Sequence, residues 1–382
     1  MVGNDYQDVL LIDANISRLV HKIELLNYVN PTNIHKAKKE FFASKYNLNP
    51  KFTYPKLGFN PYKLHRLFFS QRLERIKDET IYELYEDIIY DYSGLIQCIK
   101  TVNREDEFYY NSLRSFGSPT EKDVNNAKFI LHFKDEEADE SLNAQFSVDE
   151  AIIQFEKYTA QFGFEFNIKK SNKLSAAAMV LNKSKTLVLN KNYIYSQNEI
   201  DTLCTHEIGV HMVTTFNGVV HPLKIFSHGL PRNVETQEGL AVLSEYTSGC
   251  LTIKRLKELA YRVIAVDSLA KGYSFSDTFD LLFSQYKLNR DSAYTISLRV
   301  HRGGGFTKDY LYLSGLQKIH NYYKQGNSLD SLLTGKVSLN YLSQIEHLQA
   351  VGMARKIKYN NPDYAVNKNE NKTIDFILEN LK

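Results

Sequence analysis

The sequence lacks tryptophan and is poor in cysteine, proline and long apolar runs. Its three cysteines, Cys98, Cys204 and Cys250, are odd in number and far apart, which is typical of reduced thiols rather than of a disulfide framework. No run approaches the ~18 consecutive apolar residues of a membrane span, and the amino terminus has acidic residues where a secretory signal has basic ones. We therefore expect a soluble, cytoplasmic protein.

An excess of charge of one sign is also missing. The 47 lysines and arginines face 44 aspartates and glutamates, which leaves a formal net charge of +3. Such a mixed balance predicts binding neither to nucleic acid nor to membranes. Neither a phosphate-binding GxxxxGK[ST] loop nor a dinucleotide fingerprint occurs, so nucleotide binding is not indicated. A chain of 382 residues can still form a sizeable core.

The patterning indicates a mostly helical α+β fold. We expect residues 1–120 to form an N-terminal helical layer, with a long helical stretch over 62–100. Residues 121–382 should form the catalytic region and pack with this layer as one compact unit. Within that region, 174–181 and 186–189 flank Asn182-Lys-Ser-Lys and predict a β-hairpin in a small sheet.

Two capping boxes mark helix starts, Ser147 with Glu150 and Ser196 with Glu199. The second opens a helix that should stop at Asn217-Gly218. Further helices are expected over 237–249, 252–270, 309–325 and 338–356, and a short one near the C-terminus.

The helix that starts after Ser196 carries His206-Glu207-Ile208-Gly209-Val210-His211. Two histidines and a carboxylate that leave a fourth position open are a common catalytic zinc site, and the usual spacing is H-E-x-x-H. Here the pair is one residue further apart, so on a regular helix the imidazoles would point about 140° from each other. A single π-type turn would bring them to one side, with Gly209 easing the distortion.

The third ligand is expected from Thr236-Gln237-Glu238-Gly239-Leu240-Ala241, at the start of the next helix. Glu238 is our first choice, and Gly239 would permit close approach of the histidine helix. Glu235 and Glu245 compete with it, and Glu245 also suits a partner for a histidine N–H. Glu238 could instead simply favour the positive end of the helix dipole. Cys204 is a conceivable ligand, although a buried thiol is the simpler interpretation.

Four segments in this order resemble a known family: HEIGVH (206–211), NGVVHPLKIFSHGLP (217–231), TQEGLAVLSEY (236–246) and RVHRGGGFTKDYLYLSG (299–315). The chain resembles the bacterial flavohemoglobin expression-modulating QEGLA-motif proteins and, more distantly, the eukaryotic microtubule-associated tyrosine carboxypeptidases. The resemblance covers the chain from about Pro50 to near the C-terminus. The chain departs from the family pattern at His221, where the family commonly has glutamine.

The resemblance implies a zincin-like metallopeptidase in which His206, His211 and Glu238 hold Zn²⁺ and Glu207 activates water. It also suggests a carboxypeptidase that releases a C-terminal residue, with tyrosine as one candidate, from a peptide or protein. The departure at His221 leaves the metal residues in place but makes tubulin itself an open question as substrate.

A basic, glycine-rich segment offers groups for the substrate. Arg302 and Lys308 flank Gly303-Gly304-Gly305, and arginine and lysine are suited to gripping a free carboxylate. An ordinary loop with solvated charges is the alternative. Tyr312 is a further substrate-binding candidate, and Tyr312, His301 and His228 are candidate donors to the tetrahedral oxyanion.

Two functions follow from these observations. The first is a zinc metallocarboxypeptidase with Glu207 as the catalytic base. The second is a metal-containing regulatory or partner-binding protein with little catalysis. The presence of Glu207 beside His206 favours the enzyme, because a structural zinc site needs no base and is normally closed by four protein ligands.

Overall fold

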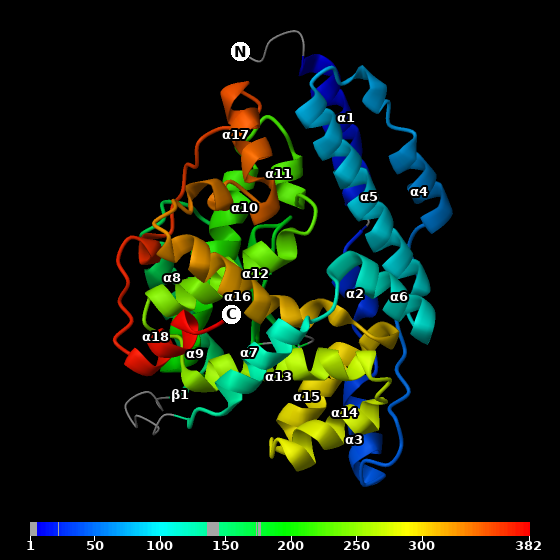
Figure 1. Ribbon diagram of the computed structural model, residues 1–382, viewed down its shortest axis with the longest axis vertical. Helices are drawn as coiled ribbons and strands as arrows, with labels where there is room; N and C mark the ends of the chain where they lie inside the picture. The colour runs from blue at the N-terminus through cyan, green and yellow to red at the C-terminus, as the bar shows by residue number, and fades with distance from the viewer. Residues whose placement is uncertain (1–5, 22, 136–144, 173, 175–176) are drawn as a thin grey trace. The chain divides into compact units, whose positions relative to one another are not determined.

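Figure 1 shows the computed structural model of the chain, which describes residues 6–21, 23–135, 145–172, 174 and 177–382. Helices make up most of the described residues and the strands are short and few. The predicted mostly helical α+β class is therefore confirmed. None of the helices in the described ranges is long and apolar enough to cross a membrane.

The chain groups into two compact units, each assembled from segments that are distant in sequence. Unit 1 comprises Met1–Asp13, Lys134–Arg255 and Ser314–Leu381, and unit 2 comprises Ala14–Phe133, Leu256–Leu313 and Lys382. Residues 256–313 thus group with the N-terminal helices. The predicted division at residue 120 stays a prediction.

Unit 1 contains the strands and the helices that follow them, together with the C-terminal helices. Its strands are β1 (Gln145–Phe146), β2 (Asn167–Ser171), β3 (Ala178–Leu181), β4 (Thr186–Asn190) and β5 (Tyr195–Ser196). Its α-helices are α8 (Val148–Thr159), α9 (Gln197–Leu203), α10 (Val213–Gly218), α11 (Ile225–His228), α12 (Asn233–Thr247), α17 (Leu342–Ala350), α18 (Lys372–Glu379) and most of α16 (Leu311–Lys324). A π-helical turn, η4 (Cys204–Met212), joins α9 to α10, and short 3₁₀ turns are η8 (Asp330–Leu333), η9 (Leu339–Tyr341) and η10 (Pro362–Tyr364).

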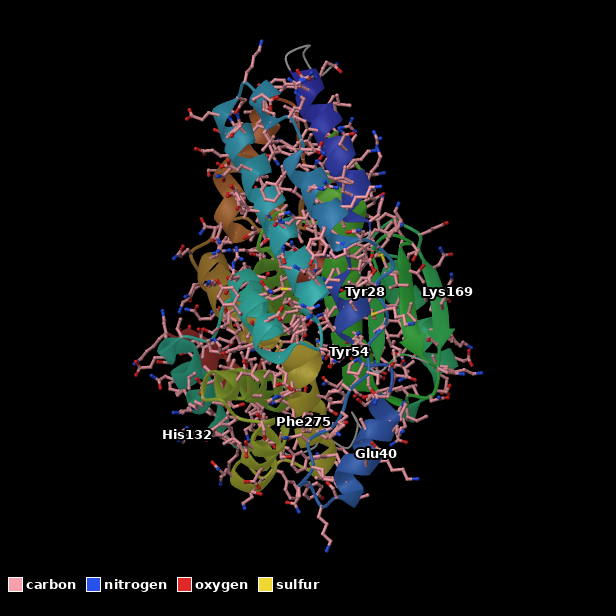
Figure 2. All side chains as sticks on the ribbon, turned by 90° about the vertical axis from the view of Figure 1, so that its right-hand side faces the viewer. Tyr28, Glu40, Tyr54, His132, Lys169 and Phe275 are labelled. Atoms are coloured by element: carbon pink, nitrogen blue, oxygen red, sulfur yellow. The ribbon has the colours of Figure 1, made fainter. Side chains whose placement is uncertain are left out.

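A three-stranded sheet in the order β2-β4-β3 includes the predicted hairpin. The first strand of this hairpin begins at Ala178 rather than at residue 174, and residues 175–176 of the prediction lie outside the described residues. β3 pairs antiparallel with β4, as the turn sequence predicted, and β2 adds a parallel neighbour on the other side of β4. The central strand β4 is buried from Thr186 to Leu189, whereas Lys169 on β2 is exposed (Figure 2). The pairing of β2 was not predicted, because its sequence Asn167-Ile-Lys-Lys-Ser lacks apolar alternation.

The two predicted capping boxes are both formed. Ser147 and Glu150 cap α8, and Ser196 and Glu199 cap α9. Phe155 of α8 is fully buried in a cluster with residues of β4 and of the segment that follows α9. One side of the histidine-bearing segment is thereby fixed in the hydrophobic core of unit 1.

Unit 2 is helical. Its elements are α2 (Leu25–Val29), α3 (Ile34–Ala43), α4 (Pro61–Phe69), η2 (Leu73–Arg75), α5 (Glu79–Thr101), α6 (Glu105–Phe116), α7 (Glu121–Leu131), most of α13 (Ile253–Ala270), α14 (Phe275–Asp280), η5 (Leu281–Gln285), α15 (Arg290–His301), η6 (Arg302–Gly304) and η7 (Thr307–Tyr310). Helices α1 (Gln7–Val20), α13 and α16 each cross the boundary between the units.

The helical stretch predicted over 62–100 is divided into two helices. Helix α4 ends at Phe69, and α5 starts anew after Asp78, whose side chain accepts a hydrogen bond from the Ile81 N–H at 3.1 Å. Helices α14 and α15 were not predicted. They pack around Phe41, whose ring lies 5.1 Å from that of Phe275 and 5.7 Å from that of Tyr294.

His221, the residue that departs from the family pattern, ties three segments of unit 1 together. Its Nε2 lies 2.8 Å from the Thr334 carbonyl, and its Nδ1 accepts the Arg355 N–H at 2.9 Å. The ring is therefore neutral, with its proton on Nε2. Glutamine could make the same pair of bonds, because its amide offers one donor and one acceptor. Burial lowers the pKa of His221 to about 4.

This environment makes the stability of the protein depend on pH. Unfolded His221 takes up a proton near pH 6.5, whereas the folded ring does so only near pH 4. The free energy of unfolding should fall as the pH drops through this window, by about 2 kcal/mol between pH 7.5 and 5. His221→Gln should keep the fold and lack this part of the fall in urea titrations. Equal falls in both proteins would contradict the assignment.

Candidate metal centre

The helix that carries His206 and His211 is π-helical where the two histidines lie. Helix α9 continues into the π turn η4, and regular α-helical pairing returns in α10. The predicted bulge around Gly209 is thus confirmed. Cys204, Ile208 and Met212, four residues apart, are buried in the core cluster. An ideal Cβ on Gly209 would lie 3.0 Å from the Tyr158 hydroxyl and the Asn361 amide nitrogen, so a larger residue there would press on both side chains.

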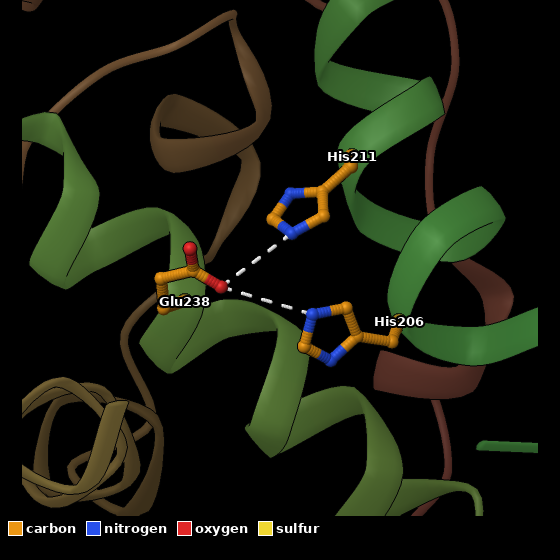
Figure 3. Close-up of side chains that lie close together, drawn as sticks. All are labelled: His206, His211 and Glu238. Atoms are coloured by element: carbon orange, nitrogen blue, oxygen red, sulfur yellow. Dashed lines mark ion pairs between the residues drawn. The ribbon is translucent and has the colours of Figure 1, made fainter. Parts of the chain in front are cut away.

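The π turn directs both imidazoles to one place. Their ring centroids lie 4.9 Å apart with the planes at 80°. The Nε2 atom of each ring lies 3.7 Å from the same carboxylate oxygen, Oε2 of Glu238 (Figure 3). Residues five apart in sequence therefore converge on one carboxylate from the neighbouring helix.

Helix α12 supplies Glu238, and its position depends on two glycines. An ideal Cβ on Gly239 would lie 2.4 Å from the carbonyl carbon of Gly315 in α16, and one on Gly315 would lie 2.1 Å from the Glu235 carbonyl oxygen. Any side chain at either glycine would force the two helices apart. Gly239 thus allows close approach, but of α16 rather than of the histidine helix, which corrects the expectation drawn from the sequence.

The three side chains fit a divalent metal ion. One donor atom from each of His206, His211 and Glu238 lies within 4.8 Å of the others. Ligands about 2.1 Å from a tetrahedral zinc lie ~3.4 Å from one another, close to the 3.7 Å separations observed here. Two imidazoles and one carboxylate are also the donors that a catalytic zinc commonly has.

The electrostatics of His206 show that the site favours a positive charge. Burial disfavours the protonated ring, but the carboxylates of Glu238 and Glu245 outweigh burial and raise the pKa of His206 to about 10. In His211 burial dominates and lowers the pKa. The carboxylates that hold a proton on His206 would equally stabilise a cation between the two rings.

Glu245 orients His206 from behind. His206 Nδ1 lies 2.8 Å from Glu245 Oε1, so this nitrogen donates and leaves Nε2 directed at Glu238. Arg255 bonds both oxygens of Glu245, at 3.1 and 3.2 Å. Burial opposes ionisation of Glu245, but the charges of Arg255 and His206 prevail and lower its pKa to about 2. Carboxylates that hold the far nitrogen of a metal-binding histidine in this way raise its basicity.

The remaining candidates in unit 1 have other surroundings. Glu235 bonds Ser314 and, at 2.8 Å, Lys318, outside the group of three. Cys204 points into the core, where burial raises the pKa of its thiol. His228 ends α11. Glu207 is half-buried next to His206, and its charge acts on both His206 and Lys336.

Lys336 is a residue of this site that sequence reasoning missed. It is only 7% exposed, and its Nζ donates to the His211 carbonyl at 3.1 Å. Burial lowers the pKa of Lys336 to about 8 against the opposing effect of the Glu238 and Glu207 carboxylates. Its sequence context, a single lysine in a loop, carries no motif that could have revealed it.

The predicted substrate-binding residues belong to unit 2. Arg302 donates to the Asn30 side chain at 2.6 Å, and its Nε is buried without a hydrogen-bond partner in the described structure. Lys308 Nζ lies 3.4 Å from the Tyr312 hydroxyl, and Arg262 lies over the ring of Tyr312 at 5.0 Å. His301, predicted as an oxyanion donor, has its Nε2 2.7 Å from the Thr278 hydroxyl.

The glycines 303–305 pack against protein rather than lining an open surface. All three have positive φ, and an ideal Cβ on Gly303 or Gly304 would lie 2.7 Å from Phe108 or Glu105. The Tyr54 hydroxyl accepts the Gly303 N–H at 2.8 Å. The interpretation that the missing side chains admit a ligand is therefore replaced by close packing on α6.

A family model described as microtubule-associated tyrosine carboxypeptidase matches residues 39–382. No curated protein matches the chain.

The geometry predicts which substitutions abolish metal binding. Wild type should bind one zinc ion, and His206→Ala and Glu238→Ala should each weaken the affinity at least about 100-fold, because each removes a ligand. Competition with a chromogenic chelator measures this. Glu235→Ala is the matched control, three residues earlier on α12, and should bind as wild type does. Wild-type affinity in Glu238→Ala would exclude the proposed ligand set.

Proposed function

The chain belongs to the microtubule-associated tyrosine carboxypeptidase family, and we propose that it is a zinc metallocarboxypeptidase that releases a C-terminal residue, tyrosine first among the candidates, from a peptide or protein. The observation that carries the proposal is the convergence of His206, His211 and Glu238. Glu207 follows the first of these ligands directly in the chain.

The proposed roles follow from the position of each group. His206, His211 and Glu238 would hold the metal, and Glu245 would keep the His206 ring oriented through its Nδ1 hydrogen bond. When bound, zinc supplies Lewis-acid chemistry: it polarises a peptide carbonyl and makes water acidic enough to lose a proton near neutral pH. Three protein ligands leave a position open for this chemistry.

Glu207 would move the proton. Its carboxylate oxygen accepts a proton from the attacking water and then delivers it to the nitrogen of the leaving amino acid. The products are the shortened peptide and a free amino acid, and the carboxylate is regenerated. The half-buried position of Glu207 beside His206 supports this role.

We further propose that Arg302, Lys308 and Tyr312 bind the free carboxylate of the substrate. The charges of Arg299, Arg302 and Arg262 surround Asp309, which is fully buried, and burial is outweighed by these charges so that the pKa of Asp309 is lowered. Lys308 adds a further positive charge over the ring of Tyr312. Guanidinium and ammonium groups of this kind bind carboxylates, which supports the proposal.

The proton-transfer role predicts a large loss of rate in Glu207→Gln. Its kcat should fall by about 10²–10⁴-fold while zinc affinity stays close to that of wild type. Mass spectrometry of peptides with varied C-termini measures release, and C-terminally amidated peptides should stay intact. Glu156→Gln, an exposed position on α8, is the control.

Three results would overturn the proposal in different ways. Full activity in Glu207→Gln would exclude this base. Internal cleavage without loss of terminal residues would exclude a carboxypeptidase. Zinc binding with no peptide processing would favour the regulatory or partner-binding alternative.

The carboxylate-binding role predicts a change in KM. Lys308→Met should raise KM about 10-fold or more for peptides with a free C-terminus, with a smaller effect on kcat, because a charge-assisted hydrogen bond to the substrate is lost. Lys271→Met, an exposed lysine of unit 2 that pairs with Asp267, should leave both constants unchanged. An unchanged KM in Lys308→Met would remove this residue from the proposed set.

A further inference from the structure

Lys336 is a buried lysine of unit 1 that has no role in the chemistry described so far. It lies between η8 and η9, and two main-chain hydrogen bonds fix its backbone: Lys336 N–H to Phe226 O at 2.7 Å, and Leu230 N–H to Lys336 O at 2.8 Å. The preceding glycine allows this close approach, because a Cβ on Gly335 would lie 2.4 Å from the Phe226 oxygen. The start of the lysine side chain is therefore held in place.

The ammonium group of Lys336 lies at the end of the π turn. It donates to the His211 carbonyl at 3.1 Å and to the Thr214 hydroxyl at 2.9 Å. The Thr214 hydroxyl lies in turn 2.9 Å from the Val210 carbonyl. One lysine thus bonds the carbonyl of a candidate metal ligand directly and the preceding carbonyl through one hydroxyl.

These bonds meet a need that the π turn creates. Where i→i+5 pairing gives way to i→i+4 pairing, one carbonyl is passed over by the main-chain N–H groups. A buried carbonyl that accepts no hydrogen bond destabilises the conformation in which it is left unpaired. At this transition the His211 carbonyl accepts bonds from Lys336 and, at 2.7 Å, from the Thr215 hydroxyl. The Val210 carbonyl accepts the Val213 N–H and the Thr214 hydroxyl. Lys336 shares with Thr214 and Thr215 the side-chain bonds that favour the π turn over a regular helix, in which the two imidazoles would point apart.

The positive charge of Lys336 also couples this residue to the π turn and to the carboxylates of the site. The carboxylates of Glu238 and Glu207 lie close enough to interact with the ammonium. A buried ammonium is costly unless hydrogen bonds and opposite charges compensate for lost hydration. Here the compensation comes from the π turn and the carboxylates around it, so Lys336 is coupled to the arrangement of the site.

We propose that Lys336 is a positioning residue of the metal centre: it stabilises the π turn that directs His211 towards Glu238. The proposal assigns Lys336 no contact with substrate. Its effect on turnover rests on the proposed function, whereas its effects on the π turn and on metal affinity do not.

The test compares Lys336→Met with wild type and with Lys324→Met. Methionine keeps most of the length of the side chain and removes the donors. Lys324 is an exposed lysine of α16 that pairs with Glu379. Hydrogen exchange of the metal-free proteins, read in peptides that cover residues 204–216, reports the π turn. Chelator competition gives the zinc affinity, and kcat and KM are measured with zinc saturating.

Lys336→Met should exchange faster in 204–216 with other segments unchanged, and should bind zinc about 10–100-fold more weakly. Its kcat should fall while KM stays within about twofold. If Lys336→Met does not fold, Thr214→Val decides, with the same changes expected at smaller size. If the variant folds and its hydrogen exchange and zinc affinity equal those of wild type, the proposal is overturned. A wild type that binds zinc but releases no residue overturns the proposed function instead and leaves the exchange result to decide on Lys336.

Discussion

The arrangement of the site depends on one constraint: two histidines five residues apart in the sequence must lie on the same face of their helix. His206 and His211 would point about 140° apart on a regular helix, yet both direct Nε2 to the same oxygen of Glu238. The π turn that achieves this is anchored on its far side by Ile208 and Met212 in the core. Hydrophobic burial on one face thus holds the polar residues on the other.

Two further layers of contacts transmit this constraint to the surrounding helices. The pair of glycines at 239 and 315 sets the separation of α12 and α16, and so the position of Glu238. Glu245, held by Arg255, fixes which nitrogen of His206 faces the site. Each of these groups acts on one of the three candidate metal ligands without being a ligand itself. The geometry of the site therefore depends on more residues than the HEIGVH motif contains.

The sequence predicted the features that follow from local chemistry. The capping boxes at Ser147 and Ser196, the hairpin of β3 and β4, and the π turn were all read correctly from short patterns. Contacts between residues far apart in the chain could not be predicted from such patterns. The role of Gly239 depends on α16, and Lys336 reaches the site only through the fold, 125 positions beyond His211. The break between α4 and α5 depends on Asp78, whose side chain caps the start of α5.

X-ray absorption at the zinc edge of the loaded wild-type protein identifies the donor atoms around the metal most directly. We expect two imidazole nitrogens together with carboxylate and water oxygens at ~2.0–2.2 Å, and no sulfur. A shell with sulfur near ~2.3 Å would place the metal on Cys204 or Cys250 instead. A shell of oxygen alone, without imidazole scattering, would contradict the convergence of His206 and His211 on a metal ion.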